Sequence, residues 1–396
     1  MPGPVLYSLG ILRNHGTALT FGVDLDHSCR MNKHLRALLY GFLFLSAAVT
    51  RPVLAGGAGT LVYPRADHAA TLLNSGQVLL CGGHIFQDGI GIIATNKAEI
   101  YTPARKMWRA TTAMTAARIA PGIVVLPDGR VLVAGGGGET TTNTAEIYDP
   151  TTRRWTMTGS MNEERDAPLI LLPTGKVLIA GGSRDVVTCE LYDPATGTWS
   201  FTGRLQHKRS FRVTLLANGQ VLASGGVGGP LQKPIPQSEV YDPAAGNWSD
   251  TGPDQMPRYG HQQLLLMDGR VLVAGGEIGH SADAMVIGSS ETYDPATGLW
   301  NIVGSLAVGR DSFSANLLGN GKVLAAGGLD NSDQSVSSTE EFDPSTNQWS
   351  TPPFALAGPR YNHTGTTLLD GSVLIAGGYG SGFGIFPAEA EVFSEP

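Results

Sequence analysis

Residues 128–155 read DGRVLVAGGGGETTTNTAEIYDPTTRRW, and this stretch decides the fold because its parts recur along the chain. It contains a tight-turn signal (Asp128–Gly129), a β-branched run and a glycine pair (Gly135–Gly136). A variable polar loop follows, then a second apolar stretch (Ala145–Tyr148), an Asp149–Pro150 turn and Trp155. Short runs of this kind between turn residues are typical of β-strands.

The composition agrees with an all-β protein. The 396 residues include 53 Gly and 24 Pro, and only 15% are charged, which suits many tight turns better than helices. A net charge of -7 without any Lys/Arg cluster argues against a nucleic-acid partner. The three cysteines, Cys29, Cys81 and Cys189, cannot form a disulfide framework. We interpret Cys81 and Cys189 as buried thiols.

The chain begins with a segment that precedes the repeats. Lys33, His34 and Arg36 give a basic start, residues 37–49 form an apolar run and residues 53–55 give a small-residue end. This is the three-part pattern of a secretory signal peptide, and the run is shorter than a membrane-spanning helix needs. The alternative, a buried helix, has no amphipathic pattern to support it.

We therefore divide the chain into three parts. Residues 1–30 are interpreted as a mis-assigned start or an extended leader, and residues 31–55 as the signal peptide. Residues 56–396 form the mature domain, which we expect to be a secreted or periplasmic monomer with no permanent membrane span.

The glycine pair recurs seven times, 44 to 53 residues apart. The pairs are Gly82–Gly83, Gly135–Gly136, Gly181–Gly182, Gly225–Gly226, Gly275–Gly276, Gly327–Gly328 and Gly377–Gly378. All six tryptophans share one repeat position: Trp108, Trp155, Trp199, Trp248, Trp300 and Trp349. An aromatic residue precedes each of them, and Phe393 holds that position in the seventh unit. A period near 50 residues with about four strands per unit predicts the blades of a propeller.

The glycine pair, Tyr and Trp at these offsets resemble kelch repeats over residues 60–396. The resemblance implies an all-β, seven-bladed kelch-type β-propeller of four-stranded antiparallel blades. In the second unit we expect strands at 118–126, 131–135 and 145–148, and a fourth from Trp155. The seventh unit lacks its fourth strand, so residues 56–62 are predicted to complete it, which would close the ring and remove an exposed sheet edge.

Residues present in every repeat are assigned to the scaffold. One is an arginine before the first strand: Arg65, Arg118, Arg165, Arg209, Arg258, Arg310 and Arg360. Another is a glutamate in the third strand: Glu99, Glu146, Glu190, Glu239, Glu291, Glu340 and Glu391. Fixed offsets predict repeated buried ion pairs, because a buried charge needs its partner. The alternative is a cationic mouth that grips an acidic ligand.

Loop lengths indicate the functional face. The loops between the second and third strands vary, and they span 84–97, 137–144, 183–188, 227–238, 277–290, 329–339 and 379–388. Antiparallel order puts them on the face where each first strand begins. A rigid scaffold with variable loops on one face commonly binds a ligand there.

The pattern breaks just after the repeated arginines, near the central axis. The candidate binding residues are Asp67, His68, Asp166, Arg212, Tyr259, His261, Asp311, Tyr361 and His363. Aromatic and polar groups at a concave mouth suit a sugar or a peptide. The alternative for the three histidines is structural: a hydrogen bond inside their own blade.

Two functions of different class remain at this stage. Resemblance to the galactose oxidase propeller implies a copper site with two Tyr, two His and a Cys cross-linked to one Tyr, but no cysteine lies on the variable face. Resemblance to secreted sialic-acid mutarotases implies an acid–base sugar enzyme that uses Arg, His and acidic residues. We expect instead a module without catalytic activity, cofactor or metal that binds a carbohydrate or a protein.

Overall fold

The computed structural model describes residues 53–54, 56–137, 142–182, 186–228, 233–279, 283–382 and 384–394. Residues 1–30 and all of the predicted signal peptide except Val53 and Leu54 lie outside these ranges. Within them the chain forms strands and one short 3-10 helix, η1 (Pro103–Arg105). No helix in these ranges is long and apolar enough to cross a membrane.

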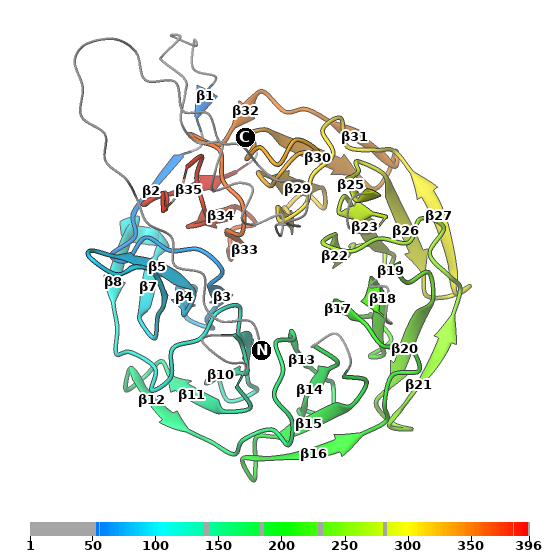
Figure 1. Cartoon of the computed structure of the whole chain (residues 1–396), viewed down its shortest axis with the longest axis horizontal. Helices are drawn as coiled ribbons and strands as arrows, with labels where there is room; N and C mark the ends of the chain where they lie inside the picture. Colours follow the sequence, from blue (N-terminus) through cyan, green and yellow to red (C-terminus); the bar gives the residue numbers. More distant parts are fainter. Residues whose placement is uncertain are drawn as a thin grey trace, which may run out of the picture.

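Seven four-stranded antiparallel blades surround a central axis (Figure 1). Each is given from its innermost to its outermost strand. Blade 1 consists of β3 (Ala69–Leu72), β4 (Val78–Cys81), β7 (Ala98–Thr102) and β8 (Met107–Ala110). Blade 2 consists of β9 (Gly122–Val125), β10 (Val131–Ala134), β11 (Ala145–Asp149) and β12 (Arg154–Met157). Blade 3 consists of β13 (Leu169–Leu171), β14 (Val177–Ala180), β15 (Cys189–Asp193) and β16 (Thr198–Thr202). Blade 4 consists of β17 (Ser210–Leu215), β18 (Val221–Gly228), β20 (Ser238–Asp242) and β21 (Asn247–Thr251).

The remaining blades follow the same order. Blade 5 consists of β22 (Gln262–Leu265), β23 (Val271–Ala274), β26 (Ser290–Asp294) and β27 (Leu299–Val303). Blade 6 consists of β28 (Ser314–Leu317), β29 (Val323–Ala326), β30 (Thr339–Asp343) and β31 (Gln348–Ser350). Blade 7 is β33 (Thr364–Thr367), β34 (Val373–Ala376), β35 (Glu389–Phe393) and β2 (Gly56–Thr60).

Blade 7 closes the ring with strands from both ends of the chain. β2 pairs antiparallel with β35, with Gly57 opposite Glu391, and the two strands lie side by side in Figure 1. The predicted seven-bladed, closed propeller is confirmed. Just before β2, β1 (Val53–Leu54) pairs in parallel with β32 (Phe354–Ala355) in the segment that enters blade 7.

The innermost strands begin later than the sequence predicted. The first strand of blade 2 was expected from Arg118, but β9 starts at Gly122. Ala120 has φ 47°, a left-handed conformation that breaks the strand, and only Ile119 before it bridges to Gly137. Asp67, Ser312 and Asn362 adopt the same conformation at the same repeat position.

The repeated arginines and glutamates form seven buried ion pairs, as predicted. Their N–O distances lie between 2.7 and 3.1 Å, and no side chain in a pair is more than 4% exposed. In blade 2 the Arg118 guanidinium also donates to the carbonyls of Gly135 and Thr144, both at 2.9 Å. Glu146 accepts the backbone N–H groups of Thr115 and Ala116. Each pair therefore ties two strands to the segment that enters the blade.

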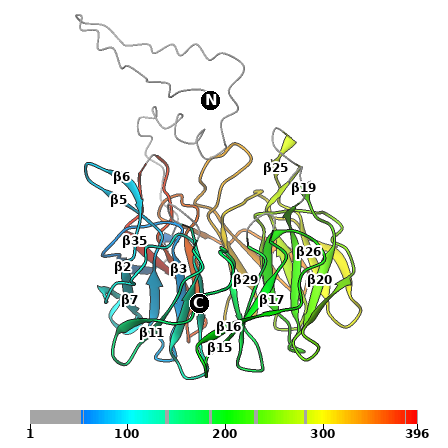
Figure 2. The same ribbon diagram turned by 60° about the horizontal axis from the view of Figure 1, so that its bottom comes forward.

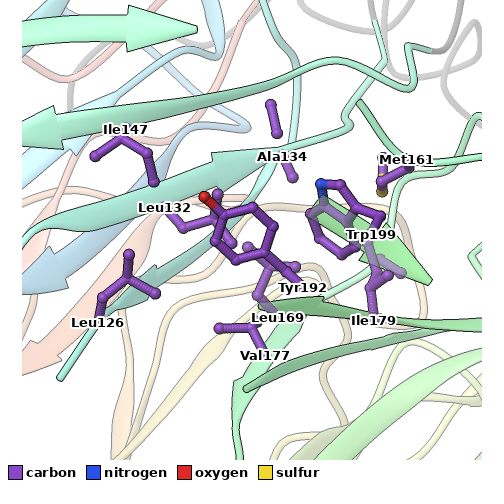
Figure 3. Packing of buried hydrophobic residues seen from close by; sticks show 12 residues of the cluster. Leu126, Leu132, Ala134, Ile147, Met161, Leu169, Val177, Ile179, Tyr192 and Trp199 are labelled. Atoms are coloured by element: carbon purple, nitrogen blue, oxygen red, sulfur yellow. The ribbon is translucent and has the colours of Figure 1, made fainter. Parts of the chain in front are cut away.

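Consecutive blades pack face to face through apolar side chains. Figure 3 shows the core between blades 2 and 3, where Leu132 and Ile147 meet Ile179, Tyr192 and Trp199. The rings of Tyr192 and Trp199 lie 5.1 Å apart, and the Tyr192 hydroxyl bonds to Thr158 at 2.8 Å. Equivalent Tyr–Trp or Phe–Trp contacts recur in blades 1 to 6.

The first glycine of each pair allows the next blade to approach. Gly135 has φ 66°, and a Cβ there would lie 2.2 Å from the Arg165 carbonyl oxygen. That carbonyl accepts the N–H of Gly136 at 3.1 Å, so the close approach is itself a hydrogen-bonded contact between blades. Glycine is therefore required here for both conformation and space.

The variable loops add small strands on one face of the ring. β5 (His84–Gln87) and β6 (Gly91–Ala94) form a hairpin in blade 1, and β24 (Glu277–Ile278) pairs with β25 (Met285–Val286) in blade 5. In blade 4, β19 (Lys233–Pro234) pairs with β18. Figure 2 shows β5, β6, β19 and β25 on the same side of the ring.

Candidate functional site

A short bridge above each inner strand defines the rim of the ring. The residue after the repeated arginine pairs with the residue after the glycine pair. The described pairs are Ala66–His84, Ile119–Gly137, Ser210–Val227, Tyr259–Glu277, Asp311–Leu329 and Tyr361–Tyr379. We call these positions the rim. Blades 5, 6, 7 and 1 place titratable or aromatic side chains on it, whereas blade 2 contributes only Ile119 and Gly137.

Two side chains, one from blade 1 and one from blade 7, meet one carboxylate oxygen of Asp67. Asp67 Oδ2 lies 2.9 Å from His84 Nδ1 and accepts the hydroxyl of Tyr379 at 2.9 Å. The same hydroxyl lies 2.8 Å from His84 Nδ1. The Asp67 and His84 side chains are 19% and 25% exposed, so solvent still reaches them.

Aromatic rings surround this group on the blade 7 side. Tyr361 and Tyr379 stack with their centroids 5.1 Å apart and their planes inclined by 29°, and Phe386 lies 5.1 Å from Tyr379. We call Asp67, His84, Tyr361, Tyr379 and Phe386 the mouth cluster. Burial and the Asp67 carboxylate raise the pKa of both tyrosines, so their hydroxyls stay protonated as donors.

The residues in the left-handed backbone conformation link the rims of adjacent blades through backbone hydrogen bonds. Asn362 N–H donates to the Ser312 carbonyl at 2.9 Å, and Asp67 N–H donates to the Asn362 carbonyl at 3.1 Å. Ala120 N–H then donates to the Asp67 carbonyl at 2.7 Å. This chain of bonds runs from blade 6 to blade 2 and fixes the position of Asp67.

Two variable loops stand beside the mouth cluster. The Phe86 ring in the β5–β6 hairpin packs on Gly384, where a Cβ would lie 3.2 Å from it. Phe86, Ile90 and Ile385 are 48%, 68% and 52% exposed. Exposed apolar side chains grouped beside a polar cluster are a feature of interaction sites.

On the neighbouring part of the rim, carboxylates come close to another tyrosine. Tyr259 in blade 5 donates its hydroxyl to Glu277 Oε2 at 2.9 Å. Burial and the charges of Glu277 and Asp311 raise the pKa of Tyr259. Asp311 also helps to raise the pKa of Tyr361, so carboxylates act on the rim tyrosines of both blade 5 and blade 7.

The three predicted histidines are buried between blades and are not part of the mouth cluster. His68 and His363 are 6% and 8% exposed, and their Nε2 atoms bond to Thr364 at 2.8 Å and Ser314 at 3.0 Å, each in the preceding blade. His261 is 1% exposed. Burial lowers the pKa of all three, to about 3 for His261 and His363. The hydrogen bonds of His68 and His363 cross to another blade, unlike the intra-blade bond considered from the sequence.

Arg212 and Asp166 lie on other parts of the ring. Arg212 is exposed on β17, although the surrounding strands still desolvate it enough to lower its pKa. Asp166, on the rim of blade 3, is also exposed, and partial desolvation raises its pKa. Of the nine predicted residues, Asp67, Tyr361, Asp311 and Tyr259 thus occupy the acidic part of the mouth.

The sequence reasoning missed His84, Glu277 and Tyr379. It placed them only as the first residues of the variable loops 84–97, 277–290 and 379–388. All three directly follow a glycine pair, so a comparison of that repeat position would have found them as departures from the pattern.

Two cavities in the described part of the chain lie away from the mouth. One of about 640 Å³ lies between blades 5 and 6 and is lined by Arg270, Asn301, Ile302 and Asn347 among others. The other, of about 260 Å³, lies between blades 1 and 2 near Arg105 and Arg153. Neither has a carboxylate or a histidine in its lining, so we place the candidate site at the mouth cluster.

Comparison with known proteins agrees with this architecture. The sequence matches the Kelch motif over residues 124–162 and 313–353. The chain is a seven-bladed β-propeller with two matches to the Kelch motif, one across blades 2 and 3 and one in blade 6. No curated protein sequence matches the chain.

Two solved structures resemble this propeller. A fungal alcohol oxidase of the AA5 family, in complex with copper, superposes with a TM-score of 0.68 at 18% identity, over 87% of this chain and 77% of the oxidase. The structure of YjhT superposes with a TM-score of 0.58 at 16% identity, over 74% of this chain and 99% of YjhT. At these identities both likenesses concern the fold alone.

The mouth cluster does not fit the copper centre that the galactose oxidase resemblance implies. It supplies two tyrosines but one histidine, and His84 already bonds to Asp67 through Nδ1. Cys81 and Cys189 are buried in β4 and β15, away from the rim. Among the described residues, no three His, Cys, Asp or Glu side chains are grouped so as to hold a metal ion.

Proposed function

We propose that this kelch propeller is a secreted carbohydrate-binding module whose ligand lies against the mouth cluster. The observation that carries the proposal is the pairing of the stacked Tyr361 and Tyr379 with the partly exposed Asp67–His84 group. Aromatic faces pack on the apolar face of a pyranose, and carboxylate and imidazole groups bond to its hydroxyls. The basic, apolar and small-residue pattern of residues 33–55 supports export.

The rim favours a neutral or cationic saccharide over an acidic one. Asp67, Asp311 and Glu277 lie along one arc, and an anionic sugar there would meet like charges. The exposed loop residues Phe86 and Ile385 extend the apolar wall for a second sugar unit.

A glycan array tests the proposal. We expect the protein to bind neutral or amino sugars and Tyr361→Ala to weaken binding at least about tenfold, the effect of losing a stacking partner. Ile119→Ala is the matched control, because it changes the same rim position in blade 2. Absence of glycan binding would overturn the proposal and favour a protein ligand, and equal loss in both variants would move the site off the mouth cluster.

A second function, acid–base catalysis on the bound sugar, is favoured by one observation. Asp67 holds Nδ1 of His84 at 2.9 Å, and an imidazole bonded in this way offers Nε2 to take a proton from a sugar hydroxyl. Anomer exchange of reducing sugars, followed by NMR, distinguishes the two functions. Catalysis predicts that His84→Gln abolishes acceleration while binding persists, whereas a pure binding module accelerates nothing.

A further inference from the structure

Asp254 departs from an apolar repeat position in the interior of the propeller. The residue four before each repeated arginine is Leu61, Met114, Met161, Leu205, Asp254, Leu306 or Leu356. Its backbone N–H donates to a loop carbonyl of the preceding blade in all seven repeats. Six of these side chains are apolar and buried, and Asp254 is buried to the same degree, at 5% exposure.

The Asp254 carboxyl joins blade 4 to the segment that enters blade 5. The backbone N–H of Asp254 donates to the Pro236 carbonyl at 2.7 Å, and the Ser238 hydroxyl, itself 0% exposed, donates to Asp254 Oδ1. Pro236 lies at the end of the blade 4 loop that carries β19, and Ser238 is the first residue of β20. Oδ2 is buried and has no hydrogen-bond partner among the described residues.

The charges around Asp254 cannot solvate it fully when it ionises. Arg209 and Arg258 face it, but they pair with Glu239 and Glu291. Glu291 also repels an ionised Asp254, and Asp250 interacts with the same Arg209 charge as Asp254 does. An ionised Asp254 must therefore draw an arginine from its glutamate or admit water to Oδ2.

We propose that Asp254 is a proton-operated latch between blades 4 and 5. When neutral, it holds the loop around Pro236 and Ser238 against the blade 5 entry. When it ionises, water reaches its carboxylate and the loop detaches from that segment. Because the loop lies on the face that bears the rim, the latch couples pH to the mobility of the blade 4 side of the mouth.

The direction of the pH effect follows from the burial. Desolvation raises the pKa of Asp254 to about 7, with Glu291 adding to the shift while Ser238 and the two arginines oppose it. The closed form therefore binds a proton that the opened form releases. From about pH 4 up to pH 7 the opening equilibrium constant should rise about tenfold per pH unit, and it should level off above pH 7, where the closed form also loses the proton.

Hydrogen–deuterium exchange of the protein between pH 6 and pH 9, corrected for intrinsic exchange rates, tests the latch. We expect the opening constant of residues 233–242 to rise about tenfold in total and to level off above about pH 8, while that of the equivalent residues 283–294 of blade 5 stays unchanged. Asp254→Asn should remove this dependence without changing side-chain volume, and Asp254→Leu, which restores the residue of four other repeats, should do the same.

Two results would overturn the latch. One is a wild-type pH response in residues 233–242 that equals the response of residues 283–294. The other is a response that persists in Asp254→Asn. If neither variant folds, the wild-type comparison of the two loops decides alone.

Discussion

The buried ion-pair ring and the rim lie only a few residues apart in every blade, yet they differ in kind. In the ring, each of the seven arginines meets its glutamate with nearly the same geometry and almost no exposure. On the rim, the next residue along the chain varies from Ala66 to Tyr259 to Asp311. The difference teaches that the repeat specifies how a blade folds, and that chemistry is found where the repeat is not obeyed.

Breaking one ion pair should have the largest effect on stability. Arg118→Ala leaves Glu146 buried without its partner, which should lower the free energy of unfolding by about 3–5 kcal/mol. Arg130→Ala is the control, because Arg130 pairs with Asp128 at the surface and should change stability by less than about 1 kcal/mol. Urea unfolding measures both. Equal effects would show that the ring is not what holds the blades together.

Adding a methyl group at the contact between blades should lower the free energy of unfolding somewhat less than breaking an ion pair does. Gly135→Ala places Cβ against the Arg165 carbonyl in a left-handed backbone, and we expect a loss of about 3 kcal/mol. Gly269→Ala has the same kind of backbone but no atom within 4 Å, so it should lose only about 1 kcal/mol. Thermal and urea unfolding of the two variants separates the steric cost from the conformational cost.

A buried histidine should give the propeller a measurable pH dependence. The pKa of His363 falls from 6.5 to about 3 on folding, so the unfolded chain binds a proton that the folded chain excludes. Stability is complete above pH 6.5 and decreases as pH falls toward 3, by about 1.4 kcal/mol per pH unit.

His363→Phe should reduce this slope by about one proton, because phenylalanine does not titrate. The variant should fold, since Phe313 already fills the equivalent position in blade 6. Unfolding free energies at pH 4, 5, 6 and 7 give the slopes. A slope that does not change in His363→Phe would mean that this imidazole is not excluded from protonation.

The sequence predicted the scaffold because the same residues occur seven times at fixed offsets. Glycine pairs, the Arg–Glu offsets and the incomplete seventh repeat together required a closed seven-bladed ring. Repeat comparison can find the members of the mouth cluster one by one, but not that they meet, because they come together only when the ring closes: Tyr379 and Asp67 are 312 residues apart. The left-handed turn that aims Asp67 also leaves no sequence signal, since Ala120 adopts it as readily.

The same comparison explains why the histidines were difficult to assign. His68, His261 and His363 look like site residues, since polar aromatic groups occur there in three blades only. In the structure the position faces the preceding blade, where Phe313 fills it equally well with apolar contact against Gly275. Periodicity locates a position in the blade, but it does not tell which way a side chain turns.

The smallest change, removal of one hydroxyl oxygen, tests the central claim most directly. Tyr379→Phe removes a bond to Asp67 on the rim, and Tyr148→Phe removes a bond to Thr111 between blades. Calorimetric titration with the best glycan, together with urea unfolding, should show about fivefold to tenfold weaker binding and stability within about 0.5 kcal/mol for Tyr379→Phe. Tyr148→Phe should lose about 1 kcal/mol of stability and bind normally. Unchanged affinity in Tyr379→Phe, or equal loss of affinity in both variants, would contradict a binding site at the mouth cluster.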